Sequence, residues 1–502
     1  MKPRFGEPDY GYEALVLSYS GYYLAVRSPV VVFNAHQGRL LGWIPVHFRM
    51  FNSSALSICP NERYLAFSEY KDNTIPIVDL ATGQILQVIE VPQMYSRICL
   101  FTPQSDAVLW QGYSGLVGND VIRQPLGTGA HQRFAPCNIP VVANGDLSLS
   151  GNWLTLNSDL YRRDEHHHWK CSPLQFCSNN LTASSISPSE RLVLYVTDEK
   201  LILVETLTAT VCMELEARHK PSESDEQSNR SHGMPCRRGF RSAALSPDET
   251  WLVASEASAQ PRVYFWHLTE STVQPRSVLA EDVTALNFAK GAGSLGLALA
   301  DKRILVWHNF GWAGTPHILR QLCELEFVRH WHLLTKRDAK AAYPSMLMLA
   351  SGSDQTVQRL SALLKPEAKP DPAANAYARS LIRQLLSDDI VASSRARQQL
   401  RSMGWQAESA LREALRNQIN DRKIQALEEL LNELSELTPE RLRQLRALQV
   451  LYMIRTAAAE KLLRQLAQGA ENSLITRDAQ WLLKVLSHQK ANTLERMKAK
   501  PN

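Results

Sequence analysis

The sequence predicts an all-β propeller followed by an all-α helical-repeat domain. One observation is a strand, turn and strand pattern that recurs about every 40 residues. The second is a set of third strands rich in β-branched and aromatic residues. The third is a change near residue 370 from an apolar period of 2 to one of about 3.6. Because a chain of 502 residues exceeds what one hydrophobic core usually organises, we expect at least two domains.

The repeat is a short apolar strand, a turn rich in Ser, Pro, Asp or Gly, and a second apolar strand. Its clearest copies run from Ala183 to Val196, from Ala243 to Ala254 and from Ala55 to Phe67. Fainter copies begin near Leu15, Ile98, Asp146 and Thr284, and another is indicated by the strand pattern of Leu347 to Leu360. Pro presets φ, Asp and Ser bond back to the backbone, and Gly permits positive φ, so these turns predict tight hairpins. The copies predict eight candidate blades, with seven possible if the first or the fourth is misread.

Third strands follow several of these hairpins. They are Ile75 to Leu80, Leu201 to Glu205, Arg262 to Leu268 and Arg303 to His308. After the first of them, the turn Ala81-Thr82-Gly83-Gln84 leads into a fourth strand. Four antiparallel strands in about 42 residues make one blade of a propeller.

Two short motifs resemble WD40 repeats. Ser246-Pro247-Asp248-Glu249 is similar to the turn of that family, and Leu349-Ala350-Ser351-Gly352-Ser353-Asp354 is similar to its Leu-Ala-Ser-Gly-Ser-Asp strand. The Trp-Asp ending of the family is replaced by Val78-Asp79, Trp266-His267 and Trp307-His308. The resemblance implies a WD40-like propeller whose blades rely more on apolar packing than on the buried polar network of regular repeats. Trp251, Trp266 and Trp307 occupy strand positions and are predicted to belong to this packing.

Three prolines between Leu364 and Ala373 mark the expected domain boundary. We therefore predict a propeller over residues 1 to 364, a linker over 365 to 374, a helical domain over 375 to 490 and a C-terminal tail over 491 to 502.

About six helices are expected in the second domain, paired as in HEAT-like repeats. Apolar residues share one helical face in two segments, namely Ile424, Leu427, Leu431 and Leu434, then Leu445, Leu448 and Tyr452. Thr438 followed by Pro439 is a helix start signal, and Gly404 and Gly469 are stop signals. Residues Arg395 to Leu415 and Leu442 to Leu466 resemble the tail of WD40 proteins of planctomycete-type bacteria, a family with no established activity.

Composition predicts a cytoplasmic protein without a membrane span. The net charge of +5 resides in the residues after 370, where acidic residues are interspersed and dilute the positive field. No apolar run approaches the roughly 20 residues that a span requires, and no signal peptide is recognised. The eight cysteines have irregular spacings, which predicts reduced thiols rather than disulfides or a zinc site.

A glycine motif at residues 291 to 296 fits G-x-G-x-x-G literally. A dinucleotide site requires a helix after such glycines, with its N-terminus toward the pyrophosphate. Here Leu297 to Asp301 reads as a strand, so the glycines predict a hairpin turn and no cofactor.

Two polar segments contain residue types found in binding sites. The run Asp164-Glu165-His166-His167-His168, with Cys171 nearby, offers metal-ligand types, but adjacent strand residues point to opposite faces. We expect an exposed polar strand or loop there rather than a metal site. Residues 217 to 239 are polar and Ser-rich, which predicts a long surface loop that either binds a partner or is a tolerated insertion.

The sequence contains no G-x-S-x-G, H-E-x-x-H or phosphate-loop motif, so no catalytic, cofactor-binding or metal-binding residue is assigned. The leading hypothesis is a non-enzymatic scaffold that binds other proteins through propeller loops and the helical tail. An alternative is a nucleic-acid-associated protein that uses Arg441, Arg443, Arg446 and Arg455 of the tail. A weaker alternative is a hydrolase that uses the propeller as a substrate platform.

Overall fold

The structure is a computed structural model. It describes the chain except for residues 1–13, 28–29, 45–54, 69–73, 92–97, 112–119, 128, 136–144, 164–168, 175–180, 198, 217–238, 258–260, 269–274, 280, 309–320, 369–370, 419, 472 and 499–502. The chain divides into two compact units. The first comprises Met1–Ile318, Asp338–Pro344 and Ser487–Asn502, and the second comprises Leu319–Arg337 and Ser345–Leu486.

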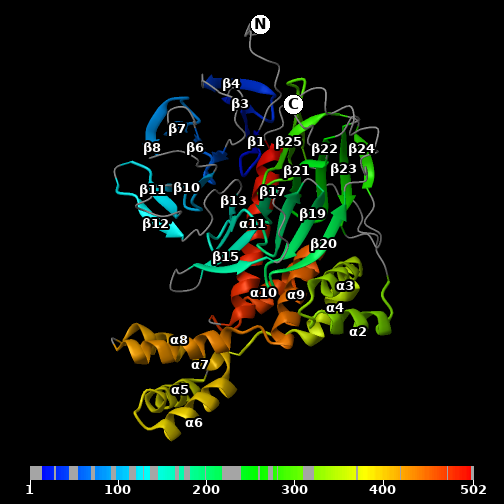
Figure 1. The fold of residues 1–502 in the computed structure, drawn as a ribbon. Helices are drawn as coiled ribbons and strands as arrows, with labels where there is room; N and C mark the ends of the chain where they lie inside the picture. The colour runs from blue at the N-terminus through cyan, green and yellow to red at the C-terminus, as the bar shows by residue number, and fades with distance from the viewer. Residues whose placement is uncertain are drawn as a thin grey trace, which may run out of the picture. The chain divides into compact units, whose positions relative to one another are not determined.

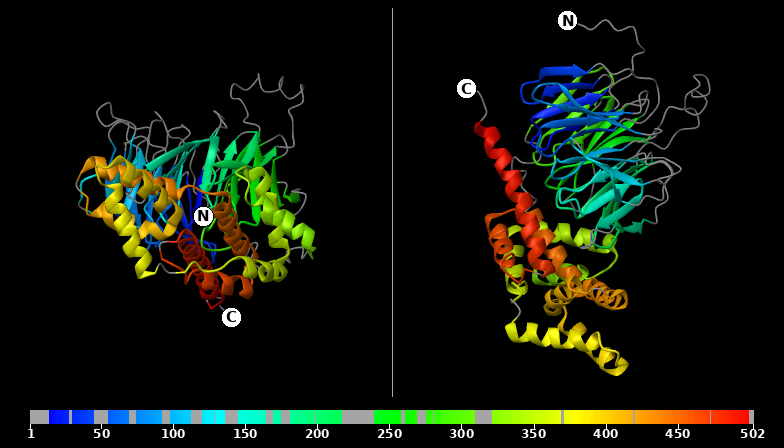
Figure 2. Two further views of the ribbon diagram at one scale, coloured as in Figure 1. Left: turned by 90° about the horizontal axis from the view of Figure 1, so that it is seen from below. Right: turned by 90° about the vertical axis from the view of Figure 1, so that its left-hand side faces the viewer.

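The first unit is a seven-bladed β-propeller, with its blades numbered here in chain order (Figures 1 and 2). Blade 1 contains β1 (Ala14–Leu17), β2 (Tyr23–Arg27), β3 (Val30–Asn34) and β4 (Arg39–Ile44). Blade 2 contains β5 (Leu56–Ile58), β6 (Tyr64–Phe67), β7 (Thr74–Asp79) and β8 (Ile85–Glu90). Blade 3 contains β9 (Cys99–Phe101), β10 (Ala107–Gln111), β11 (Val121–Pro125) and β12 (Gln132–Ala135). Blade 4 contains β13 (Gly145–Leu147), β14 (Trp153–Leu156), β15 (Asp159–Arg163) and β16 (Trp169–Pro173).

The remaining three blades follow the same order. Blade 5 contains β17 (Leu181–Ile186), β18 (Leu192–Thr197), β19 (Lys200–Glu205) and β20 (Thr210–Glu216). Blade 6 contains β21 (Gly239–Leu245), β22 (Trp251–Ala257), β23 (Arg262–His267) and β24 (Pro275–Leu279). Blade 7 has three described strands, β25 (Val283–Phe288), β26 (Leu295–Leu299) and β27 (Ile304–Trp307).

Within each blade, successive strands pair antiparallel, so each sheet is a meander. The first strands of neighbouring blades pack against one another, and β1 packs on β25, which closes the ring. Apolar cores lie between neighbouring blades. For example, Ile75 and Ile77 of blade 2 share one buried cluster with Phe101 and Trp110 of blade 3. Burial of these apolar side chains between sheets is the main attraction that joins one blade to the next.

The predicted role of three tryptophans in packing is confirmed. Trp251 and Trp266 are buried, and Trp307 is partly buried against the cluster between blades 6 and 7.

The turn from the first to the second strand has one geometry in every blade. Its first residue accepts a backbone hydrogen bond from the fourth and donates one to the residue five positions on, as in Ser187, Glu190 and Leu192. In blades 1 to 6 the side chain of the first residue also accepts from that last N–H group. These first residues are Ser18, Cys59, Thr102, Ser148, Ser187 and Ser246. The sequence-predicted hairpins are thus confirmed, and the side chain satisfies a backbone donor that the turn would otherwise leave exposed.

The fourth residue of this turn has positive φ in blades 1 to 6. It is glycine in blades 1 and 4, and a residue with a polar side chain in the others. We call the face of the propeller that carries these turns the turn face; its turns are residues 18–22, 59–63, 102–106, 148–152, 187–191, 246–250 and 289–294.

The strand prediction for Leu347 to Leu360 is wrong, and the number of blades is seven. This segment is helical, divided between α3 (Ala339–Ser351) and α4 (Ser353–Leu363). Its buried residues Met346, Leu349 and Ala350 recur at helical spacing of three or four, which outweighs a six-residue likeness to a strand motif. Gly352 separates the two helices; a Cβ there would lie 2.3 Å from Thr356 Oγ1.

The glycine motif at residues 291 to 296 forms the hairpin between β25 and β26, as predicted. Gly291 lies under the ring of Tyr19 in blade 1, since an added Cβ would lie 2.3 Å from Tyr19 Cε1. Gly296 faces Leu15 and Leu24 of blade 1, whose side chains would lie 3.1 and 3.3 Å from a Cβ added at this glycine. Both glycines are therefore explained by the close contact of blade 7 with blade 1.

The described residues beyond the propeller strands form ten helices, and seven of them, α5 to α11, lie in the segment for which about six were predicted. Besides α3 and α4 they are α2 (Glu324–Leu333), α5 (Pro372–Leu385), α6 (Ile390–Met403), α7 (Trp405–Arg416), α8 (Asp421–Ser435), α9 (Pro439–Ile454), α10 (Ala457–Leu466) and α11 (Leu474–Lys498). The helices begin at Glu324, before the linker predicted at residues 365 to 374.

Several helix signals read from the sequence are confirmed. The Thr438 side chain caps α9 by accepting from Arg441 N, with Pro439 at the first position. Gly404 ends α6 with φ of 59°. Leu427 of α8 and Leu445, Leu448 and Tyr452 of α9 are fully buried. The apolar faces of α5 to α8 share one core, in which α5 packs on α7 and α6 on α8.

We predict that Gly291→Ala lowers the free energy of unfolding by about 1 to 3 kcal/mol, because the added methyl group must displace the Tyr19 ring. Chemical denaturation measures the change. Gly42→Ala is the control, because an added Cβ there meets nothing within 4 Å. In a Tyr19→Ala background the cost should shrink; an unchanged cost would show that the ring is not the obstacle.

Candidate functional site on the turn face of the propeller

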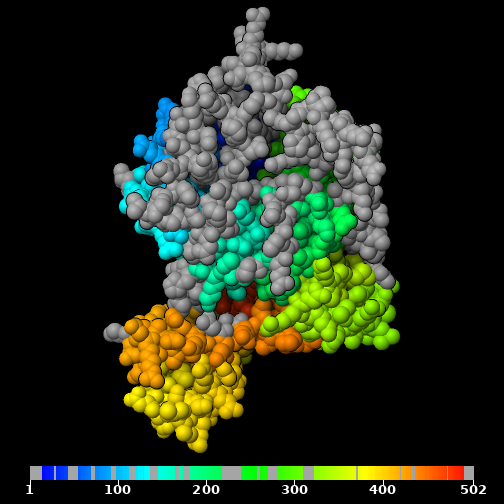
Figure 3. Space-filling model, viewed as in Figure 1, coloured from blue at the N-terminus to red at the C-terminus, as the bar shows by residue number. Residues whose placement is uncertain are grey.

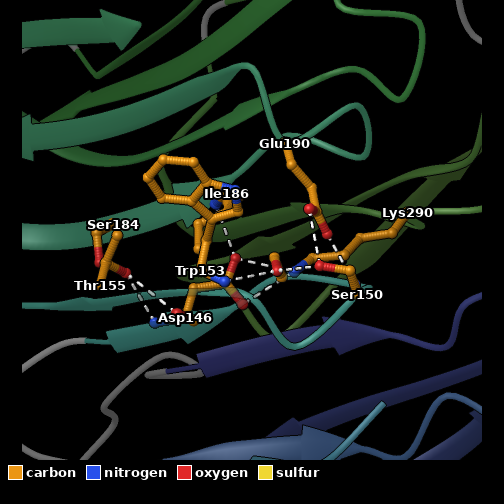
Figure 4. A network of polar contacts seen from close by, with 9 residues as sticks. Asp146, Ser150, Trp153, Thr155, Ser184, Ile186, Glu190 and Lys290 are labelled. Carbon is orange, nitrogen blue, oxygen red and sulfur yellow. Dashed lines mark hydrogen bonds and ion pairs between the residues drawn. The ribbon is translucent and has the colours of Figure 1, made fainter. Parts of the chain in front are cut away.

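Polar side chains connect neighbouring turns on the turn face. The fourth residue of one turn reaches back to the third residue of the preceding turn. Glu190 accepts from both Ser150 N and Ser150 Oγ, at 2.7 and 2.8 Å (Figure 4). Glu62 accepts from the same two groups of Ser20, with the hydroxyl at 2.7 Å. We call each such contact a clasp, because it ties one blade to the next by side-chain hydrogen bonds.

Two further clasps follow the same rule. Glu249 of blade 6 accepts from Ser189 N of blade 5 at 3.1 Å, and Ser105 of blade 3 accepts from Asn61 N of blade 2 at 3.1 Å. A clasp requires a side-chain oxygen at the fourth turn position. The residue there has positive φ, a backbone conformation that is unfavourable for any residue other than glycine.

Three blades lack an oxygen at that position. Blades 1 and 4 have Gly21 and Gly151, and blade 7 has Ala292. At the seam of blades 7 and 1, a backbone bond from Gly291 N to Tyr19 O at 2.9 Å takes the place of a clasp. Burial of the Tyr19 ring there raises the pKa of its hydroxyl to about 12. At the seam of blades 3 and 4, Pro103 lies against Gly151, where an added Cβ would lie 3.1 Å from Pro103 Cγ.

An ion pair crosses from blade 7 to blade 4. Lys290 Nζ lies 2.9 and 2.8 Å from the two carboxylate oxygens of Asp146, and Asp146 Oδ2 also accepts from Ile186 N of blade 5 at 2.8 Å (Figure 4). Blades 4 and 7 are not neighbours in a ring of seven, so this link spans the axial opening. The side chains are 31% and 16% exposed, which makes the pair partly desolvated and stronger than a surface pair.

A second layer of hydrogen bonds supports Asp146. Thr155 Oγ1 accepts from Asp146 N at 2.9 Å and lies 3.0 Å from Ser184 Oγ of blade 5. These contacts hold the backbone of Asp146 in place and so position its carboxylate. The network as a whole connects blades 4, 5 and 7.

Burial raises the pKa of the Glu190 carboxyl, and the two hydrogen bonds from Ser150 oppose that shift. The side chain therefore carries a desolvation cost at neutral pH that its hydrogen bonds offset in part.

Sequence reasoning did not find the clasp residues. Their partners lie some 40 to 60 residues away, and the ion pair joins residues 144 apart. A signal was present, however, because glutamate recurs at the fourth turn position of three copies, as Glu62, Glu190 and Glu249. A surface turn has no local reason to repeat that residue, so the repetition points to a contact between repeats.

The other sequence candidates are placed as follows. The run Asp164 to His168 lies outside the described residues, and so does 217–238 of the predicted loop. Cys171 is exposed on β16. Within the part of the chain that the structure describes, no group of three or more His, Cys, Asp or Glu side chains could hold a metal ion.

The four tail arginines do not form one basic surface. Arg446 is fully buried and donates to the carbonyl of Leu334 at 2.8 Å and to that of Lys336 at 2.5 Å, so its predicted role in binding nucleic acid is wrong. Arg441 donates to Leu434 O, and Arg443 pairs with Glu440 and lies over the Trp331 ring. The Arg455 guanidinium lies over the Tyr452 ring.

Exposed apolar side chains gather on the outer strands of blades 1 and 2. They are Leu40 and Leu41 of β4, and Ile85, Leu86 and Val88 of β8, each 44% exposed or more. Figure 3 shows the outer edge of blade 2 at the surface in blue. β8 is the last strand of its sheet in the described residues, so its outer side presents backbone groups as well as these side chains. In the described part of the chain, no helix has both the length and the apolar character to span a membrane.

The chain is similar to solved structures at low sequence identity. No protein-family model and no curated protein matches it. Among solved structures it is similar to the β-propeller domain of Cps50 (Swd1) from Myceliophteria thermophila, with 14% identity and a TM-score of 0.45 over 60% of this chain and 97% of that chain. It is also similar to hydrazine synthase from Kuenenia stuttgartiensis, with 13% identity and a TM-score of 0.47 over 61% and 97%. At such identities no activity or partner is transferred to this chain.

We predict that Asp146→Ala lowers the free energy of unfolding by about 2 kcal/mol, because Lys290 and Ile186 N both lose an acceptor. A double-mutant cycle with Lys290→Met should give a coupling energy of about 1 kcal/mol. Arg241→Met removes a more exposed pair between blades 6 and 7, Arg241 with Asp282 at 3.1 Å, and should cost less than about 0.5 kcal/mol. Equal costs for the two pairs would contradict a special role of the axial link.

Glu190 should make the stability of the propeller fall as pH rises above the ordinary carboxyl pKa of 4.5. Below that value the carboxyl is protonated in the folded and unfolded states alike. Between that value and the raised pKa, the unfolded state releases the proton and the folded state keeps it, which favours unfolding. The Glu190→Gln variant lacks this loss, so the wild type should lose stability relative to it across that window. Denaturant titrations at a series of pH values test this, and parallel profiles for the two proteins would contradict it.

Proposed function

We propose that this chain is a non-enzymatic, cytoplasmic protein-interaction scaffold, built from a WD40-like propeller and a HEAT-like helical region that each bind partner proteins. The observation that carries the proposal is the apolar outer edge of blades 1 and 2, formed by β4 and β8. Ile85, Leu86 and Val88 are 53%, 54% and 50% exposed on one short edge strand. A solvated edge strand of this kind favours addition of a further strand, and natural proteins usually protect such edges with charge.

Other outer strands of the propeller are more polar. β20 carries Glu214 and Glu216, and Glu214 pairs with Lys200 and Lys340. β12 begins with Gln132 and Arg133, and Arg133 pairs with Asp120. Among the propeller strands whose side chains are described, exposed large apolar residues lie on β4 and β8, as expected of a binding surface rather than of a general property of the ring.

The occupant we propose for β8 is an extended segment of a partner protein with alternating apolar side chains. Main-chain hydrogen bonds to the outer side of β8 would supply affinity, and the side chains of Leu86 and Val88 would supply specificity. Such a mode needs no covalent chemistry and no cofactor.

The helical region supports a second partner surface. α5 stacks on α7 and α6 on α8, and ion pairs join the stacked helices, with Arg379 to Glu413 at 2.8 Å and Arg397 to Glu429 at 3.1 Å. Stacking of helix pairs is the arrangement of HEAT-like repeats, whose extended surfaces bind proteins. The same ion pairs use arginines that would otherwise contact phosphates, so the nucleic-acid alternative is not favoured.

The test compares proteins captured by the full chain with those captured by the Leu86→Lys/Val88→Lys variant. We expect the variant to lose a specific partner that the wild type retains, because two charges on the edge oppose strand addition. The matched control is Ile390→Lys/Val391→Lys, which changes residues 84% and 58% exposed on α6. The same set of proteins on all three baits would contradict the proposed surface, and turnover of a small molecule by the purified chain would contradict the scaffold function.

A further inference from the structure

The C-terminal part of α11 contacts the turn face at blade 6. Residues 487 to 498 belong to the propeller unit. Gln489 is 1% exposed, and its Nε2 donates to the carbonyl oxygen of Pro247 at 3.0 Å. Pro247 is the second residue of the blade 6 turn, which begins at Ser246. A helix from the end of the chain is thus hydrogen-bonded to a propeller turn that lies 242 positions earlier in the sequence.

The blade 6 turn receives no clasp from the following blade, blade 7. A clasp on blade 6 would come from the fourth turn residue of blade 7, and that residue is Ala292, which has no side-chain oxygen. The first residue of the blade 7 turn is Ala289, so that turn also lacks the side-chain acceptor that the other six contain. The blade 7 turn is held instead by the Lys290 ion pair with Asp146 of blade 4, which does not involve blade 6.

The seam of blades 6 and 7 keeps other contacts, which lie away from the turn. Ser242 Oγ accepts from Leu286 N at 3.2 Å and donates to Leu286 O at 3.4 Å, along the first strands. Arg241 pairs with Asp282 at 3.1 Å. These contacts hold the strands but do not reach the turn of residues 246 to 250.

We propose that residues 487 to 498 are a strap that binds the blade 6 turn, to which blade 7 supplies no clasp. The surface is the blade 6 turn, and its occupant is the chain's own C-terminal helix. Because the Gln489 amide is buried, separation of the strap from Pro247 leaves polar groups without their bond, so the strap stays in place unless something competes for them. The turn face at blade 6 is thereby occupied, and a partner of the propeller must use another surface or displace the strap. This inference does not depend on the proposed function.

Hydrogen exchange on the full chain tests the strap. In Gln489→Ala, amides bonded within the blade 6 turn, such as Glu249 N, should exchange about tenfold faster, as expected for loss of a buried hydrogen bond. The blade 2 turn, with Glu62 N, should not change. Gln480→Ala is the matched control, because Gln480 lies on the same helix and its Nε2 donates to Ala467 O at 3.1 Å.

A second variant and a second readout complete the test. Gln489→Glu places an oxygen where the donor was and should have the same effect or a larger one. In the unmodified chain, amides of residues 487 to 490 should be protected to the same extent as those of the blade 6 turn. The proposal is overturned if exchange at that turn is unchanged in both Gln489 variants, if Gln480→Ala has an equal effect there, or if the strap amides exchange rapidly in the unmodified chain.

Discussion

The propeller depends on one short turn, repeated around its axis. Each copy must reverse the chain between two buried strands, and in blades 1 to 6 a Ser, Thr or Cys side chain at the first position accepts a backbone donor that would otherwise remain unpaired. In blades 1 to 6 the fourth residue has positive φ, and in blades 2, 3, 5 and 6 its side chain contacts the preceding blade. Where the residue there carries an oxygen, the turn also joins two blades. A local requirement of the hairpin thus also supplies polar contacts at four of the seven seams between blades.

Much of this fold could be predicted from the sequence, because a blade is a local object. The turn and its two strands lie within a dozen residues or so, and their turn residues and apolar alternation appear in the printed order. The segment Leu347 to Leu360 shows the limit of that reasoning. Its Leu-Ala-Ser-Gly-Ser-Asp letters match a strand motif, whereas burial of Met346, Leu349, Ala350 and Leu360 follows a helical period over a longer stretch. Periodicity over a whole segment reflects packing, and a short motif does not.

The candidate site could not be predicted in the same way, because its contacts are set by ring closure. Nothing near Lys290 or Asp146 in the sequence indicates that blades 4 and 7 face each other across the axis; that follows only from the number of blades. The need for glycine at residues 291 and 296 also depends on ring closure. Their local context excludes a dinucleotide site, but the reason for glycine is the Tyr19 ring and the leucines of blade 1, which arrive from the other end of the propeller.

The positive charge of the helical region does not by itself indicate what the chain binds. Composition places the positive charge in the helical region, yet Arg379, Arg397 and Arg401 are paired with glutamates of the helices stacked on their own, and Arg446 is buried on carbonyl oxygens. Those charges maintain helix packing, so net charge is a poor guide to the partner. In the propeller, the axial ion pair and the clasps likewise use polar groups for cohesion. In the described propeller strands, the large apolar side chains that stay exposed are those of the outer strands β4 and β8. Because exposed apolar area on an edge strand is costly to solubility and the ring does not need it, this edge is the surface on which the proposed protein contact rests.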